Sequence, residues 1–302
     1  MAVLPPWAVD LLSEMGREVQ GILEYPISKQ DSSIAYYEGI GGAHFLSRTA
    51  VPYAMSSLDT PVYHRYLAEF GGENPNVVVA DIGGGDGRNA LPWLERGFSR
   101  VVVVDPVRAA LLRLRDWVTQ NRPEWLSRLL LIRAEARKLP LRSTVAQRVF
   151  AIESLYYLNE DEPVGVAECV RILAPGGRFL IADRDWEGAL LSSLLYNGGI
   201  GPMLDMADGR DTWDGVGADV VRNRTTTEPE LRHLLETAGL EVLSLRGISA
   251  FSLIVGFLRS VDRLGPGAEA RLPQMHNLLQ RLGEEGRFRR ALVAVAKRRG
   301  DV

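Results

Sequence analysis

Short apolar runs alternate with helix-length segments after residue 76, and this alternation constrains the fold more than any other feature of the sequence. Such runs are typical of strands that are buried on both faces of a parallel sheet. They are Val77–Ile82, Val101–Asp105, Leu129–Arg133, Val149–Ile152, Arg178–Asp183, Glu241–Leu245 and Ala291–Ala296, with helices predicted over Arg88–Arg96, Pro106–Asn121 and Pro163–Leu173. The pattern predicts a doubly wound α/β fold, in which a seven-stranded, mostly parallel sheet carries helices on both faces.

Two segments fall outside this alternation. Residues 1–75 are rich in aromatic side chains and contain a glycine-rich break, so we expect an N-terminal helical lid or substrate segment there. Helical periodicity between the last two strands predicts a helical insertion at about 249–288. The main domain is therefore expected at residues 76–302. Within it, Thr227 and Glu230 form a capping-box pattern that predicts the start of a helix.

The composition indicates a small-molecule partner. The formal net charge is -3 and the pI is about 5.9, so no overall electrostatic attraction to nucleic acid or to an anionic membrane is expected. The single cysteine, Cys169, excludes an internal disulfide and a cysteine-rich metal site. No apolar run reaches the roughly 18 residues of a membrane span, and the N-terminus lacks a signal-peptide pattern. We expect a cytoplasmic protein, monomeric or homodimeric.

A glycine-rich turn follows the first predicted strand. Gly83 and Gly85 come directly after Asp81-Ile82, and glycine there allows positive φ angles and a close approach of a ligand to the backbone. The turn alone could be merely a tight turn. Asp105 ends the next strand, and its carboxylate could accept hydrogen bonds from both hydroxyls of a ribose. It could also cap a helix that begins at Pro106, and the two roles can coexist.

The residues around this turn discriminate between nucleotides. A dinucleotide fingerprint would place a third glycine at position 88, which is arginine, and the Gly-Lys-Ser/Thr of a P-loop does not occur. Asp81 and Asp86 would repel phosphate groups. They suit a ligand that carries an amino group and a sulfonium.

The segment from Asp81 to Gly87 resembles motif I of the class I S-adenosylmethionine (SAM) dependent methyltransferases, in particular the small-molecule branch related to ubiquinone and biotin biosynthesis. Asp105 resembles that family's ribose-binding acid, and Glu135-Ala136 resembles the segment that contacts the adenine. The resemblance implies a Rossmann-like fold, SAM as the cofactor, and methyl transfer to an O, N, S or C nucleophile of a small molecule.

The resemblance also implies a set of cofactor-binding residues. These are Asp81, Gly83, Gly85, Asp105, Pro106, Glu135, Ala136, Glu153 and Tyr37. Glu135 departs from the family pattern, which usually has Asp there. The segment after the fourth strand lacks the Asn-Pro-Pro-Tyr signature of amino methyltransferases, so the methyl acceptor stays open.

A general base is needed only if the acceptor is not already deprotonated. Glu153 and Asp183 are candidates because they end the fourth and fifth strands, where ligands collect in open α/β sheets. His44, in the aromatic N-terminal segment, is a third candidate.

Two other functions remain open: a methyltransferase acting on RNA or protein, and a catalytically silent SAM-binding scaffold. The first would need a basic or open acceptor face, whereas the N-terminal segment and the insertion look like covers. The second would be expected to have a degraded motif I. Acids at Asp205, Asp208, Asp211 and Asp214 lie on a predicted loop and are more typical of solvated side chains than of metal ligands, so no metal is expected.

Overall fold

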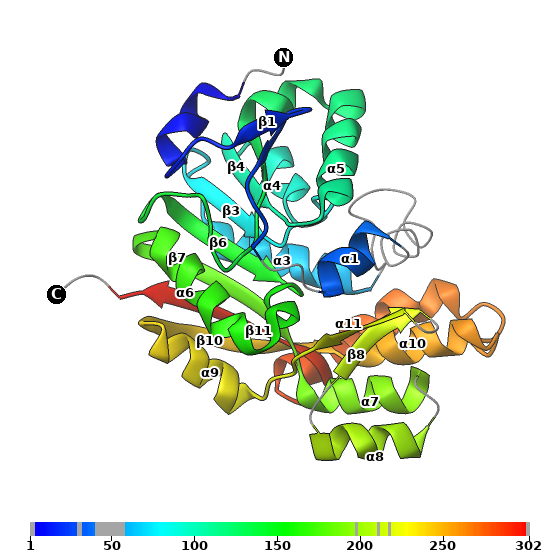
Figure 1. The fold of residues 1–302 in the computed structure, drawn as a ribbon. Helices are drawn as coiled ribbons and strands as arrows, with labels where there is room; N and C mark the ends of the chain where they lie inside the picture. The colour runs from blue at the N-terminus through cyan, green and yellow to red at the C-terminus, as the bar shows by residue number, and fades with distance from the viewer. Residues whose placement is uncertain are drawn as a thin grey trace.

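The computed structural model describes residues 4–28, 32–39, 58–196, 199–209, 212–216 and 219–299. Its centre is a nine-stranded sheet in the order β1-β2-β5-β4-β3-β6-β7-β11-β10 (Figure 1). The strands, in that order, are Arg17–Val19, Ile22–Glu24, Leu129–Arg133, Arg100–Val104, Val78–Ile82, Ala146–Ile152, Leu173–Arg184, Arg289–Arg298 and Leu240–Ser249. From β2 to β7 every neighbouring pair is parallel, whereas β11 is antiparallel to both β7 and β10. The predicted α/β class is confirmed.

The sheet has two strands more than the sequence predicts. A hairpin of β1 and β2, joined at Gln20 and Gly21, extends the edge beyond β5. The apolar pair Ile22 and Leu23 is fully buried, and Leu23 lies opposite Ile132 of β5. Strands of three residues are too short to show alternation, so residues 17–24 were not distinguishable from the helical segment expected there.

Helices cover both faces of the sheet. One apolar cluster packs α3, α4 and α5 on the first face, and the other packs α6 and α9 on the second. The helices are η1 Pro6–Leu11, α1 Ser32–Glu38, α3 Asp59–Gly71, α4 Leu91–Glu95, α5 Arg108–Asn121, η2 Pro123–Arg128, η3 Leu155–Asp161, α6 Glu162–Ile172, α7 Trp186–Tyr196, α8 Ile200–Gly209, α9 Glu228–Thr237, α10 Phe251–Ser260, η4 Glu269–Arg271 and α11 Leu272–Glu284. Among the residues so described, none forms a helix long and apolar enough to cross a membrane.

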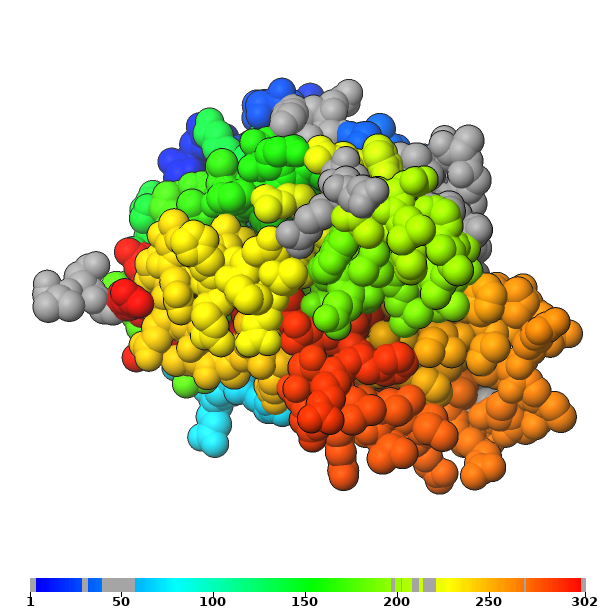
Figure 2. Space-filling model, turned by 90° about the horizontal axis from the view of Figure 1, so that it is seen from below, coloured from blue at the N-terminus to red at the C-terminus, as the bar shows by residue number. Residues whose placement is uncertain are grey.

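The expected insertion between β10 and β11 is helical, as α10, η4 and α11. Together with α7 and α8 it forms the surface in Figure 2, beside α9. A small hairpin of β8 (Thr212–Val216) and β9 (Asp219–Asn223) follows α8. The loop predicted to carry four acids is wrong, because Asp205 and Asp208 lie within α8 and Asp214 lies within β8, while Asp211 is outside the described residues. The capping box of Thr227 and Glu230 is confirmed, with the Thr227 amide donating to Glu230 Oε2 at 2.8 Å.

Two predicted helix starts are too early. The chain stays in turns after the glycines, so α4 begins at Leu91 rather than Arg88. The helix expected from Pro106 begins at Arg108, because Val107 is extended and forms its N-cap.

The carboxyl ends of the parallel strands meet at one edge of the sheet. The glycine turn follows β3, Asp105 follows β4 and Glu153 follows β6. Because β11 runs in the opposite direction, its first residues Arg289 and Arg290 lie at the same edge. The N-terminus of α3 also lies here, where Asp59 pairs with Arg290. This edge is where ligands bind in open α/β sheets.

Candidate cofactor and acceptor site

The two glycines of the turn have different surroundings: Gly83 is tightly packed, whereas Gly85 faces open space. Gly83 has φ 73°, and a Cβ there would lie 2.3 Å from the Cβ of Ser154, so only glycine fits. Gly85 has φ 55°. Within the described part of the chain, a Cβ at Gly85 would meet only Asp105 Oδ2, at 4.0 Å. A ligand can therefore approach the backbone at Gly85.

Asp105 accepts two backbone hydrogen bonds at the glycine turn. Its Oδ2 accepts the Gly85 amide at 2.8 Å, and its Oδ1 accepts the Val107 amide at 2.8 Å. The side chain thus fixes the turn and the backbone of Val107, the residue before α5, while its contact with a ribose stays a prediction. Burial raises the pKa of Asp105 to about 6, while these two hydrogen bonds act to lower it. Each oxygen keeps a lone pair that can accept a ribose hydroxyl.

Two more carboxylates at the turn are buried and incompletely bonded. Asp81 Oδ2 and Asp86 Oδ2 have no hydrogen-bond partner among the described residues. Burial raises the pKa of Asp81 well above its ordinary value, and Asp105 adds to this. Burial also raises the pKa of Asp86 to about 6, against the effect of Arg88. A buried acceptor without a partner costs about 1–3 kcal/mol, so a cationic ligand group would fit here.

Glu135 is held by the N-terminal segment. Its Oε1 accepts hydrogen bonds from the Ser28 amide, at 3.0 Å, and from the Ser28 hydroxyl. Its Oε2 lies 3.5 Å from Arg137 Nη1, and Arg137 also pairs with Asp161 at 2.7 Å. The neighbouring Ala136 packs against the core. The acid expected to contact an adenine is thus buried, with Oε2 the less occupied of its two oxygens.

Further contacts bind the N-terminal segment beside Asp105. Glu38 of α1 accepts the amides of Arg108, at 2.6 Å, and of Ala109, at 3.3 Å, and so caps α5. Arg108 Nε also donates to Glu24 Oε1 at 2.7 Å. Residues 17–28 and 32–38 therefore lie against the part of the edge formed by β4 and β5.

Tyr37 reaches the loop that follows β6. Its hydroxyl lies 2.7 Å from that of Tyr157, and the two rings meet edge to face with centroids 5.7 Å apart. Tyr36 packs on Tyr37 in the same way, at 5.1 Å. The two tyrosines join the N-terminal segment to η3. A role for Tyr37 in cofactor binding stays a prediction.

Known proteins resemble this chain in sequence. Residues 80–181 match the family model of the methyltransferase domain. Methyltransferase GfsG of Streptomyces halstedii is 30% identical over 217 residues, which are 69% of this chain and 64% of that protein. The ubiquinone/menaquinone biosynthesis C-methyltransferase UbiE of Acidiphilium cryptum is 28% identical over 181 residues, 58% of this chain and 70% of that protein. Residues 80–181 therefore form a methyltransferase domain, and the chain is similar to SAM-dependent methyltransferases beyond it.

A solved structure extends the likeness of fold over most of the chain. The crystal structure of the 4+2 cyclase SpnF superposes with a TM-score of 0.62, covering 92% of this chain and all of that chain at 15% sequence identity. The chain spans just under two thirds of GfsG. The likeness to this family therefore rests on the methyltransferase domain, and the fold likeness includes the segments around it.

Glu153, which follows β6, belongs to a buried ion-pair network. Its Oε1 accepts Arg290 Nη1 at 2.5 Å, its Oε2 lies 3.9 Å from Arg88, and Arg290 Nε donates to Asp59 Oδ2 at 2.7 Å. Burial alone would raise the pKa of Glu153, but Arg290 and Arg88 bring it below its ordinary value. A carboxylate stabilised in this way is a weak base, so the network favours a structural role for Glu153.

Asp183 faces the opposite side of the sheet, toward Glu162 at the start of α6. Burial raises the pKa of Asp183 well above its ordinary value, and Glu162 raises it further. Asp183 Oδ1 accepts the Arg184 amide at 2.8 Å. The three candidate bases are therefore not brought together: Glu153 and Asp183 lie on different faces, and His44 lies outside the described residues.

Several residues of the edge were not singled out by the sequence. Ser28 and Asp59 carry no local motif, because their partners lie 107 and 231 positions away. Arg290 precedes the last apolar run, where exposed charge is ordinary. The sequence signal that could have indicated Arg290 as a site residue is its place at the start of an antiparallel strand, beside the carboxyl ends of the parallel strands.

Proposed function

We propose that this chain transfers a methyl group from SAM to an O, N, S or C nucleophile of a small molecule. The observation that carries the proposal is the glycine turn, where open space over Gly85 adjoins the buried carboxylates of Asp81, Asp86 and Asp105. The relatives support it, since GfsG is named a methyltransferase and UbiE a C-methyltransferase of ubiquinone/menaquinone biosynthesis.

Different residues of the site would bind different parts of the cofactor. The backbone at Gly83 and Gly85 lets the methionine part approach, and the partnerless oxygens of Asp81 and Asp86 suit its ammonium group. Asp105 would accept the ribose hydroxyls and Glu135 Oε2 the adenine amino group. Bound SAM supplies a methyl group activated by its sulfonium. The chain's own contribution is alignment of the acceptor, an effect worth up to about 7–11 kcal/mol of barrier.

The wider setting is also a proposal. We propose a cytoplasmic enzyme, monomeric or homodimeric, with no nucleic-acid partner. The net charge of -3 supports this, because a nucleic-acid enzyme needs a basic face.

Calorimetry with S-adenosylhomocysteine tests the cofactor. We expect binding in the micromolar range without added metal, and no binding of NAD or ATP. Binding of NAD or ATP without a response to S-adenosylhomocysteine would overturn the proposal. Incubation with methyl-labelled SAM and metabolite extracts then tests transfer. Binding without any labelled product would favour a silent scaffold or another reaction on the same fold.

A further inference from the structure

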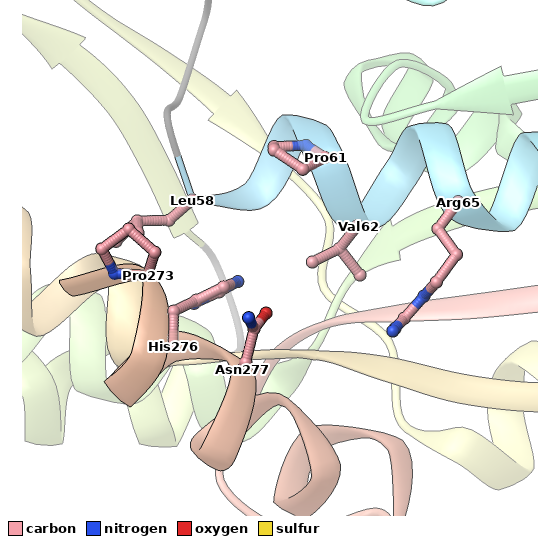
Figure 3. Close-up of a pocket in the computed structure, with 7 residues that line it drawn as sticks. All are labelled: Leu58, Pro61, Val62, Arg65, Pro273, His276 and Asn277. Carbon is pink, nitrogen blue, oxygen red and sulfur yellow. The ribbon is translucent and has the colours of Figure 1, made fainter. Parts of the chain in front are cut away.

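A pocket of about 300 Å³ opens between the N-terminus of α3 and α11 (Figure 3). Its size is at the lower end of that of ligand pockets. It is lined by the apolar Leu58, Pro61, Val62 and Pro273 and by the polar Arg65, His276 and Asn277. The α3 side is therefore apolar except for Arg65, and the α11 side offers the hydrogen-bonding groups of His276 and Asn277 beside Pro273.

His276 projects from α11 into the space between Leu58 and Val62 (Figure 3). It is only 3% exposed, and in the described part of the chain neither ring nitrogen makes a hydrogen bond of good geometry. The Leu58 backbone lies near enough to act as a long hydrogen-bond partner of the ring, which acts to raise the pKa of His276. The ring of Phe251 stacks on it with centroids 6.3 Å apart. Even with the Leu58 backbone as the partner of one ring nitrogen, the other nitrogen is left for a ligand.

The chemistry of the pocket favours an uncharged ligand. Burial lowers the pKa of His276, and Arg290 and Arg65 act in the same direction against Asp59. A neutral imidazole presents one donor and one acceptor nitrogen, which matches a hydroxyl group. The charge of Arg65 is paired with Glu284. An anion would thus find no uncommitted cation among these lining residues.

Contacts connect the pocket to the glycine turn. Leu58 precedes Asp59, which pairs with Arg290, and Arg290 pairs with Glu153. The next residue, Ser154, packs against Gly83. The pocket therefore lies at the same edge of the sheet as the candidate cofactor site, on the side away from Asp105 and Glu135.

We propose that this pocket binds an uncharged, largely apolar group that carries a hydroxyl, as part of the methyl acceptor, with His276 as its hydrogen-bond partner. The assignment to the acceptor rests on the proposed function. The binding of such a group by the pocket does not depend on it.

Three soluble probes of similar shape test the charge preference: benzyl alcohol, benzylamine and benzoate. The full chain is labelled with ¹³C at its four histidines, and the His276 signal is assigned by its loss in His276→Gln. We expect benzyl alcohol to shift this signal with a dissociation constant on the order of millimolar, and to bind about tenfold more tightly than either charged probe. Tighter binding of benzoate, or an unchanged His276 signal at saturating probe, overturns the proposal.

Variants and competition give the controls. His233→Phe removes an exposed histidine on α9 and should leave the binding of benzyl alcohol unchanged. Asn277→Trp alters an exposed residue on the rim and should weaken this binding about fivefold or more without affecting folding. Excess S-adenosylhomocysteine should not displace benzyl alcohol; displacement would place the cofactor in the pocket and overturn the acceptor assignment. If S-adenosylhomocysteine does not bind but benzyl alcohol does, the methyltransferase proposal fails, whereas the proposal that the pocket binds a hydroxyl-bearing apolar group is retained.

Discussion

The edge of the sheet has two parts: the proposed cofactor part, formed by β3, β4 and β5, and the proposed acceptor part, formed by β6, β7, β11 and α3. The glycine turn of the cofactor part differs from the acceptor part in how far apart in the sequence its bonded residues lie. At the glycine turn Asp105 bonds to residues 2 and 20 positions away. Elsewhere in the cofactor part Glu135, at β5, bonds to a distant residue, Ser28, 107 positions away. In the acceptor part Arg290 bonds to Glu153 and Asp59, which are 137 and 231 positions away. Residues that bond to near neighbours form a motif that can be recognised in the sequence. The partners of a long-range ion pair appear in the sequence only as separate charged residues.

The largest effect is expected in the acceptor part, from Arg290→Ala. Removing one partner of a buried ion pair typically costs about 3–5 kcal/mol, and here two carboxylates, those of Asp59 and Glu153, would lose theirs. Urea unfolding measures the loss. The exposed Arg287→Ala is the matched control and should change the free energy of unfolding by less than about 0.5 kcal/mol. A loss below about 1 kcal/mol for Arg290→Ala would show that the network is not a stability element.

Two glycine variants in the cofactor part distinguish an effect on packing, measured as stability, from an effect on the approach of the ligand, measured as affinity. Gly83→Ala combines a positive φ with a clash against Ser154, so we expect a loss of about 2–4 kcal/mol in the free energy of unfolding. Gly85→Ala has the same strain without the clash. It should cost about 1 kcal/mol in stability and act mainly on the affinity for S-adenosylhomocysteine.

The double variant Gly83→Ala/Ser154→Gly checks the cause. If the clash is responsible, it should recover more than half of the stability lost in Gly83→Ala. Equal affinity losses for Gly83→Ala and Gly85→Ala in folded protein would contradict the distinction.

The same division explains what the sequence could predict. The central strands and the residues of the glycine turn followed from apolar runs and one motif, since both are set by near neighbours. The hairpin of β1 and β2 was missed because its strands contain only three residues each. Glu153 was predicted correctly at a strand end, but its partners Arg290 and Arg88 depend on the tertiary fold, so neither its ionisation nor its weak basicity could be inferred.

Asp105→Asn tests whether the cofactor part binds a ribose. Asparagine keeps the size but loses the charge, and charge-assisted hydrogen bonds contribute about 1.5–3 kcal/mol, so affinity for S-adenosylhomocysteine should fall about ten- to a hundredfold. At pH 7 the stability of the free protein should change little. Two contributions to stability oppose each other. Asparagine loses the acceptor for one amide, which costs about 1–3 kcal/mol. It also avoids the cost of burying a charged carboxylate, which is about 3 kcal/mol for a pKa raised from 3.8 to about 6. Unchanged affinity with lower stability would assign Asp105 to structure alone.

The pH dependence of binding gives an effect of about tenfold. The pKa of Asp105 and that of Asp86 are both raised by burial to about 6. The folded chain holds these protons more tightly than the unfolded chain, so their contribution to stability is present below about pH 4 and is lost as the pH rises to about 6. Ionised carboxylates bind the ligand better, so affinity for S-adenosylhomocysteine should rise about tenfold from pH 5 to pH 7. The rise should be smaller in Asp105→Asn, and a flat profile in the wild type would contradict the assignment.

The smallest effect concerns Ser28, where the N-terminal segment meets the cofactor part. Its hydroxyl and amide both bond to Glu135 Oε1, while Oε2 has only a long contact of 3.5 Å with Arg137. An adenine can therefore use Oε2 while Ser28 holds the carboxylate in place. Ser28→Ala should loosen Glu135 and weaken binding of S-adenosylhomocysteine about fivefold, less than Glu135→Gln does. Tighter binding in Ser28→Ala would mean instead that the hydroxyl competes with the adenine, and that the N-terminal segment must move before the cofactor binds.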